Sequence, residues 1–174
     1  MKIKLENVRL SFPSLFRKAQ FNGVETKYEA TLLLSKSEHA SAIEQIQAAV
    51  KSKIANDLKG AKLAADKICL RDGDEVEYEG YEGHMSLKAA NKKRPLVLNK
   101  DKTPLTEDDN VIYGGCYVNA IVELWAQNNE YGKRINANLL GVQFVRDGES
   151  FGAGGVSATT DDFDDLGGDD DFSF

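Results

Sequence analysis

The sequence predicts a mostly β fold: a five-stranded barrel with an inserted α-helix and additional short strands, followed by a disordered acidic C-terminal tail. Runs of alternating apolar and polar residues recur between residues 2 and 146, as they do in half-buried strands. One stretch, residues 37–60, has instead the three- and four-residue apolar spacing of a helix. From residue 151 onward, Gly, Ser, Thr and Asp dominate, and such a segment cannot form a core.

The opening part of the chain is expected to form two paired strands. Residues 2–12 alternate, and Pro13 is expected to end the first strand because proline cannot donate a hydrogen bond to the ladder. A turn signal at residues 22–23 leads to the second strand at 27–34. Between the strands, residues 16–21 mix aromatic and basic side chains, which suits either a backbone-binding patch or aromatic rings packed under a loop.

The predicted helix begins with Ser37 as its N-cap and ends at Gly60. Its outer face carries lysines, which are interpreted as solvated. Further short strands are expected as a pair within residues 67–78 and singly at 85–90 and 95–98, and a long surface loop at 99–113.

A long β-hairpin at residues 117–146 is the clearest element. The runs YVNAIVELWAQ and RINANLLGVQFVR flank a short polar connector that contains a glycine. The first arm places Tyr117 and Trp125 on its outer face, opposite an apolar face made of Val118, Ala120, Val122, Leu124 and Ala126. Alternation slips near Gly141, which predicts a bulge or bend that lets the strand curl into a barrel.

Charge divides the chain into two predicted parts. The net charge is −6, and removing the seven aspartates of residues 151–174 from the 28 acidic residues leaves 21 acidic against 22 basic groups in residues 1–150. We therefore expect a nearly neutral binding domain at 1–150, then a flexible linker and an acidic tail at 151–174.

Motifs for catalysis or metal binding are not found in the sequence. Phosphate-cradling glycine loops, a nucleophile–base pair and an HExxH helix are all missing. The cysteines and histidines lack ligand spacing and are interpreted as structural or solvated: Cys69, Cys116, His39 and His84. With no apolar run long enough for a bilayer and no signal peptide, the chain is expected to be a soluble, intracellular, non-catalytic protein without metal or cofactor.

Aromatic and basic residues mark the predicted binding surface. Barrels of the OB type hold single strands in a basic groove and stack bases on exposed rings, at roughly 1–3 kcal/mol per base whatever the base. The stacking candidates are Trp125, Tyr117 and Tyr131, although Trp125 could instead pack under the long loop and Tyr131 could be a solvated turn residue. The candidates for phosphate contacts are Lys88, Lys92, Lys93, Arg94, Lys133 and Arg134.

Three segments carry a likeness to known proteins: LENVRLSFPSLF at the start, GCYVNAIVELWAQNNEYGKRINANLLGVQFVRDGE late in the body, and the ending DDDFSF. Through these and the central helix, nearly the whole chain resembles the OB-fold single-stranded DNA-binding proteins of tailed phages. The resemblance implies sequence-independent binding of single-stranded DNA in phage replication, recombination or repair, in the cytoplasm of the bacterial host cell. It leaves open whether the protein is a homo-oligomer.

The acidic-aromatic ending is similar to C-termini that dock on polymerases, helicases and other replication proteins. By this likeness the partner-binding residues are Asp169, Asp170, Asp171, Phe172 and Phe174. A tail of this charge is also expected to compete with DNA for the basic groove; the alternative is a solubilising extension. The alternative functions are a virion or assembly interaction protein and a strand-annealing recombination protein.

Overall fold

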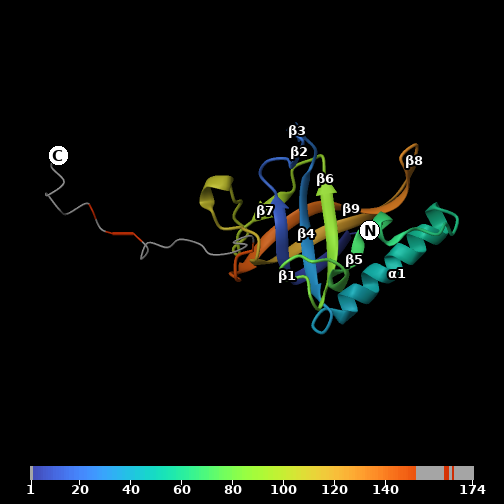
Figure 1. The fold of residues 1–174 in the computed structure, drawn as a ribbon, viewed down its shortest axis with the longest axis horizontal. Helices are drawn as coiled ribbons and strands as arrows, with labels where there is room; N and C mark the ends of the chain where they lie inside the picture. Colours follow the sequence, from blue (N-terminus) through green and yellow to red (C-terminus); the bar gives the residue numbers. More distant parts are fainter. Residues whose placement is uncertain (1, 152–162, 165, 167–174) are drawn as a thin grey trace.

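The computed structural model describes residues 2–151, 163–164 and 166, and within them five strands close into a barrel (Figure 1). Neighbouring strands run antiparallel, except at one seam where β6 and β9 are parallel and pair through Ala90 and Asn138. The predicted mostly β barrel is thus confirmed. Its strands are β1 (Lys2–Ser14), β4 (Tyr28–Ser35), β6 (His84–Asn91), β8 (Tyr117–Asn129) and β9 (Gly132–Arg146).

The inserted helix, α1 (Ala40–Asp57), packs against β4, β8 and β9 and covers one end of the barrel (Figure 1). Its apolar spacing buries Ile43, Ile46 and Val50. The predicted N-cap at Ser37 is wrong, because the Ser37 hydroxyl meets that of Ser35, 3.1 Å away, and the chain is still turning there. The helix therefore starts after His39.

Short elements extend the barrel at its edges. Only one strand, β5, forms where a strand pair was expected within the described residues 67–78, because the Asp72 carboxylate accepts from the Asp74 N–H and turns the chain. The 3-10 turn η2 follows it directly. The short strands and 3-10 turns of the described chain are β2 (Gln20–Phe21), β3 (Val24–Glu25), β5 (Leu70–Asp72), β7 (Leu96–Leu98), η1 (Ala65–Lys67), η2 (Gly73–Glu75) and η3 (Glu107–Asp109).

Two irregular positions bend β1 so that it can pair with both β4 and β8. At Asn7 (φ 54°) the register with β8 shifts. A second register shift, in the pairing of β1 with β4, includes Phe12 (φ 47°) and Pro13. Pro13 does not end the strand as predicted, since it lies in this irregularity, where no ladder bond is needed, and β1 continues to Ser14. The bend leaves Phe12 exposed on the barrel surface.

The β8–β9 hairpin forms a long wall of the barrel and projects beyond it (Figure 1). Four of the five residues of the predicted apolar face are buried and Ala126 is half-buried, while Tyr117 and Trp125 on the opposite face are half-buried. Ile121 pairs with Gly141 and Val122 with Leu139, so Leu140 is the extra residue of a bulge. The bulge predicted from the slip in alternation is confirmed.

The last described part of the body folds back onto β1. The Arg9 guanidinium lies 4.0 Å from the centre of the Phe151 ring and donates to the Glu149 carbonyl at 2.6 Å. The Phe151 N–H donates to the Gly114 carbonyl at 2.9 Å. The chain is therefore fixed to the barrel up to Phe151, while residues 152–162, 165 and 167–174, most of the predicted linker and tail, lie outside the described residues.

This fold-back requires a glycine at position 115. A Cβ on Gly115 (φ 112°) would overlap the Glu149 carbonyl, whereas one on Gly132 (φ 105°) would meet nothing within 4 Å. Both alanine variants carry backbone strain of about 1–3 kcal/mol. Gly115→Ala should lower the free energy of unfolding, measured by urea denaturation, by at least about 1 kcal/mol more than Gly132→Ala. Equal losses would show that the 149 carbonyl does not pack against this position.

Candidate nucleic-acid interface

A groove of about 320 Å³ opens where β6 and β9 diverge from their pairing at Ala90 and Asn138. Cys69 joins the two strands at this point: its N–H donates to the Ile135 carbonyl at 2.9 Å, and its carbonyl accepts from the Lys88 N–H at 3.1 Å. The backbone is thereby hydrogen-bonded although the strands have separated. We call this hollow the seam groove, because the parallel seam of the barrel creates it.

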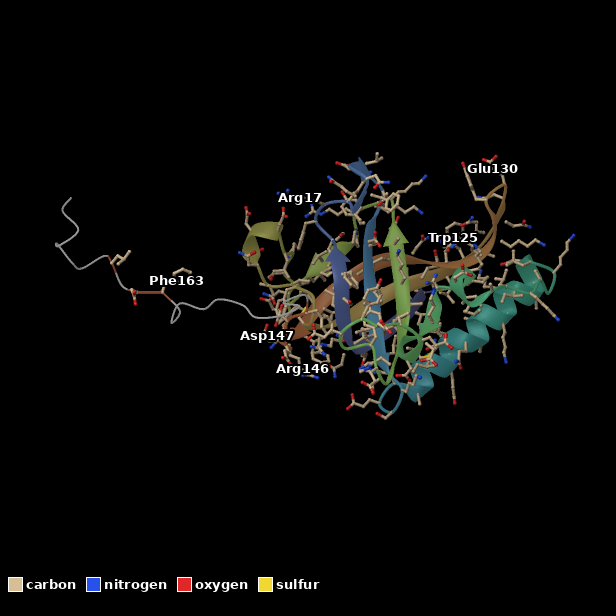
Figure 2. The ribbon with its side chains drawn as sticks, viewed as in Figure 1. Arg17, Trp125, Glu130, Arg146, Asp147 and Phe163 are labelled. Carbon is tan, nitrogen blue, oxygen red and sulfur yellow. The ribbon has the colours of Figure 1, made fainter. Side chains whose placement is uncertain are left out.

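Three of the predicted binding residues line the seam groove: Trp125, Lys88 and Arg134. Trp125 lies opposite Asn136 in the β8–β9 register, and its ring is only half-buried. Figure 2 shows it on the hairpin between the barrel and the tip at Glu130. The Lys88 ammonium is 3.4 Å from the Glu29 carboxylate, but the lysine side chain is exposed, so this pair constrains it little.

Further cations of the groove come from places that the sequence reasoning missed. Lys27, Lys67 and Arg71 also line it, against one acidic residue, Asp66. Arg71 donates to the backbone carbonyl of Asp66 at 2.7 Å, which holds its guanidinium at the groove edge. These cations precede β4 or lie on either side of Cys69, and none of them is adjacent in the sequence to another basic residue.

A second hollow, of about 290 Å³, shares Arg71 and Lys88 with the seam groove. Aromatic rings form part of its lining. The rings of Phe12 and Tyr78 meet edge to face, 5.2 Å apart, and Tyr81 lies 5.2 Å beyond Tyr78. Phe12 is 59% exposed and Tyr78 is 56% exposed, so both rings face solvent. We call these three residues the aromatic shelf. Sequence patterns do not predict this shelf, because the exposure of Phe12 depends on the bend in β1.

An acidic loop borders the shelf. Residues 72–82 contain six carboxylates and no basic residue. The Lys36 ammonium nitrogen lies 2.7 Å from a carboxylate oxygen of Asp72 and 2.6 Å from one of Asp74. These hydrogen bonds lower the pKa of both carboxyls. The site is therefore cationic around Trp125 and becomes anionic beyond Tyr78, which limits how far a negatively charged ligand can follow it.

Neutral groups also line the two hollows, beside the Glu29 carboxylate of the second one. Burial raises the pKa of the Cys69 thiol to about 11, so this thiol carries no charge near pH 7. Burial also raises the pKa of Tyr81, whose hydroxyl donates to Ser11 at 2.9 Å. In the seam groove, the Asn136 side-chain amide donates to the Gln127 side-chain carbonyl oxygen at 2.9 Å. These two polar side chains of the lining therefore hydrogen-bond to each other.

Other predicted residues lie away from the seam groove. Tyr117 is at the far end of β8, where Arg146 stands 3.7 Å and Arg9 5.9 Å from its ring centre. Tyr131 is 78% exposed at the hairpin tip. The others are Lys92, Lys93 and Arg94 between β6 and β7, exposed Lys133 at the start of β9, and the tail residues Asp169, Asp170, Asp171, Phe172 and Phe174, which lie outside the described residues.

Metal-ligand clusters and membrane-spanning helices are both missing from the described residues. No group of three or more His, Cys, Asp or Glu side chains there could hold a metal ion. Within the same residues, no helix is both long enough and apolar enough to cross a membrane. The two cysteines are buried and unpaired, as their interpretation as structural thiols requires.

Comparison with known proteins identifies relatives in phages. The family described as "Enterobacter phage Enc34, ssDNA-binding protein" matches residues 1–173. Protein p50 of Acyrthosiphon pisum secondary endosymbiont phage 1 is 46% identical over 176 residues, covering 95% of this chain and 94% of its own.

Two solved structures are also similar. The single-stranded DNA-binding protein of bacteriophage Enc34 in complex with ssDNA is 36% identical, with a TM-score of 0.78 over 87% of this chain and 89% of the other. A C-terminal truncation of the Enc34 protein is 36% identical, with a TM-score of 0.75 over 86% and 88%.

Proposed function

The chain belongs to the family of the phage Enc34 ssDNA-binding protein, and from this membership we propose that it binds single-stranded DNA along the seam groove. The observation that carries the proposal is the half-buried Trp125 beside five cationic side chains in one groove. A ring that stacks bases and cations that contact phosphates are the two components of single-strand binding.

The bases and the phosphates would use different parts of the site. Trp125 offers one stacking surface, and the exposed rings of Phe12 and Tyr78 offer a second. Lys88 and Arg71 line both hollows and would contact the phosphates between them. Stacking does not discriminate among bases, so binding would be independent of sequence.

Membership of the family and the composition of the tail also support a wider role. The protein would act without catalysis or cofactor in phage DNA replication, recombination or repair, in the cytoplasm of the bacterial host cell. Residues 1–150 would bind DNA, and residues 151–174 would be a linker and a tail that recruits replication proteins such as a polymerase or helicase. The attachment of Phe151 to the barrel supports a division near this position.

Trp125 and Tyr117 provide a matched test of the stacking surface, since both are half-buried aromatic residues on the same face of β8. Trp125→Ala should weaken binding of a fluorescent oligo-dT by roughly 1–3 kcal/mol, the value of one stacked base. Tyr117→Ala should change it much less, because Tyr117 already packs against Arg146. Fluorescence anisotropy measures both affinities. An equal loss in the two variants would place the DNA elsewhere on β8.

The salt dependence of binding tests the phosphate contacts. Arg71→Ala and Lys88→Ala should each reduce the slope of log affinity against log salt by about 0.7, the value for one lost contact with a single strand. Lys93→Ala is the control, since Lys93 does not line the seam groove. If Lys93→Ala changed the slope and the other two variants did not, the path of the strand would follow the β6–β7 connection instead.

Competition between the tail and DNA is tested by deleting residues 161–174, which removes seven negative charges. The truncated protein should bind oligo-dT more tightly than the full chain, most clearly at low salt, because salt screens the attraction between tail and body. It should also lose binding to replication partners. Identical DNA affinities across a salt series would rule out the competition.

A further inference from the structure

A second groove, of about 420 Å³, lies between α1 and the edge formed by β5 and β6. We call it the helix groove; its lining residues are Gln47, Val50, Lys51, Ile54, Ile68, Leu70 and Met85. Most of these are apolar, and Ile54, Ile68 and Met85 remain partly exposed. Burying such surface gains free energy, so the groove suits an apolar ligand.

We propose that the helix groove receives the acidic-aromatic tip of the same chain, residues 169–174. The proposal rests on the proposed function, because it gives the competing tail a specific place to bind. In this arrangement Phe172 or Phe174 fills the apolar groove, and the three aspartates before them face the cations around it. The tail then weakens DNA binding from beside the seam groove and not by covering Trp125.

Charge complementarity favours this occupant. The segment 51–71, which supplies four of the lining residues, contains six basic residues and two aspartates, a net charge of +4. Residues 1–150 as a whole carry only +1, so positive charge is concentrated in this segment of the sequence. The tail has seven aspartates and no basic residue, and an apolar groove with Lys51 in its lining matches its alternation of Asp and Phe.

Another apolar hollow of the described body fits the tip poorly. A cavity of about 390 Å³ near the aromatic shelf is lined by Phe12, Tyr78 and Phe151, but also by Glu77 and Glu79. These carboxylates belong to the acidic loop, which would repel the aspartates of the tip. The helix groove has no acidic residue in its lining.

The helix groove adjoins the seam groove, so a tip bound in the helix groove could affect DNA binding in the seam groove. Ile68 lines both of them, and Lys67 lines the seam groove next to it in sequence. Aspartates bound at this boundary would interact with Lys67 and Arg71, two of the seam-groove cations that are available to contact phosphates. Occupation of one groove would therefore weaken ligand binding in the other without direct overlap of bases and tail.

The chain is long enough for this contact within one molecule. Phe172 follows Phe151, the last residue of the anchored body, by 21 positions in the sequence. An extended segment of this length reaches roughly 70 Å. A domain of about 150 residues has a radius of gyration near 15 Å and is about 40 Å across. The tip can therefore reach any part of its own barrel surface.

Photo-crosslinking of the full chain tests the proposal. The substitution Phe174→p-benzoylphenylalanine keeps an aromatic ring at the tip and reacts with nearby C–H bonds, including those of methionine. Without DNA and at low salt, we expect crosslinks within one chain to the peptides containing Ile54 and Met85. Crosslinks to Trp125 or Arg134, to a second chain, or spread evenly over the body would each overturn the proposal.

Two neighbouring helix residues provide matched variants of the groove. Ile54→Gln places an amide in the apolar lining, whereas Ala55→Gln changes an exposed position outside it. In the crosslinking chain, Ile54→Gln should reduce the specific crosslinks at least fivefold and Ala55→Gln should leave them unchanged. Equal yields in both variants would overturn the proposal. Circular dichroism checks that both variants keep the fold.

Oligo-dT binding measured on the same samples separates this inference from the proposed function. If the crosslinks form as expected but no DNA binds to the full or the tail-deleted chain, the tip site stands and the DNA proposal fails. If DNA binds and the crosslinks fall elsewhere, the DNA proposal stands and the tip site fails. When both hold, saturating oligo-dT should lower the crosslink yield, because phosphates and the tip share Lys67 and Arg71.

Discussion

The barrel closes through a parallel pairing of β6 with β9, and the position of the seam groove follows from that pairing. Four sides of the barrel are antiparallel ladders, but its closure rests on the pairing of Ala90 with Asn138 and on Cys69, which bonds to both strands beyond it. Because the strands diverge there, the barrel has a groove in its wall. Side chains from separate parts of the chain line this groove, so the pairing that closes the barrel also brings them together.

A body that is nearly neutral in total can still bind an anion, because its charges are unevenly distributed. Residues 51–71 carry +4, whereas residues 72–82, which follow at once, carry six carboxylates and no cation. The boundary between these segments runs along the cavity near Arg71. Cations surround Trp125, and carboxylates surround the aromatic shelf. On the proposed path of the DNA, this arrangement would favour phosphates at one end of the groove and bases at the other.

Regular alternation made much of the fold predictable from the sequence. The hairpin, its apolar face and its bulge followed from a two-residue period and one slip, and the same period placed Trp125 on the outside. The wrong predictions are Ser37 as the N-cap, Pro13 as a strand end and a strand pair within residues 67–78. They concern positions where side-chain bonds or an irregular register override local preference. The site was harder to predict, because Lys27, Lys67 and Arg71 come together only through the seam.

Binding along the seam groove is best tested by following the emission of Trp125, the only tryptophan, during titration with oligo-dT at two salt concentrations. A base stacked in the seam groove should quench this emission in step with binding, and the affinity should fall at the higher salt because cations hold the phosphates. Binding that leaves the tryptophan emission unchanged would contradict a seam-groove path for the DNA. Absence of binding, with or without the tail, would contradict the proposed function itself.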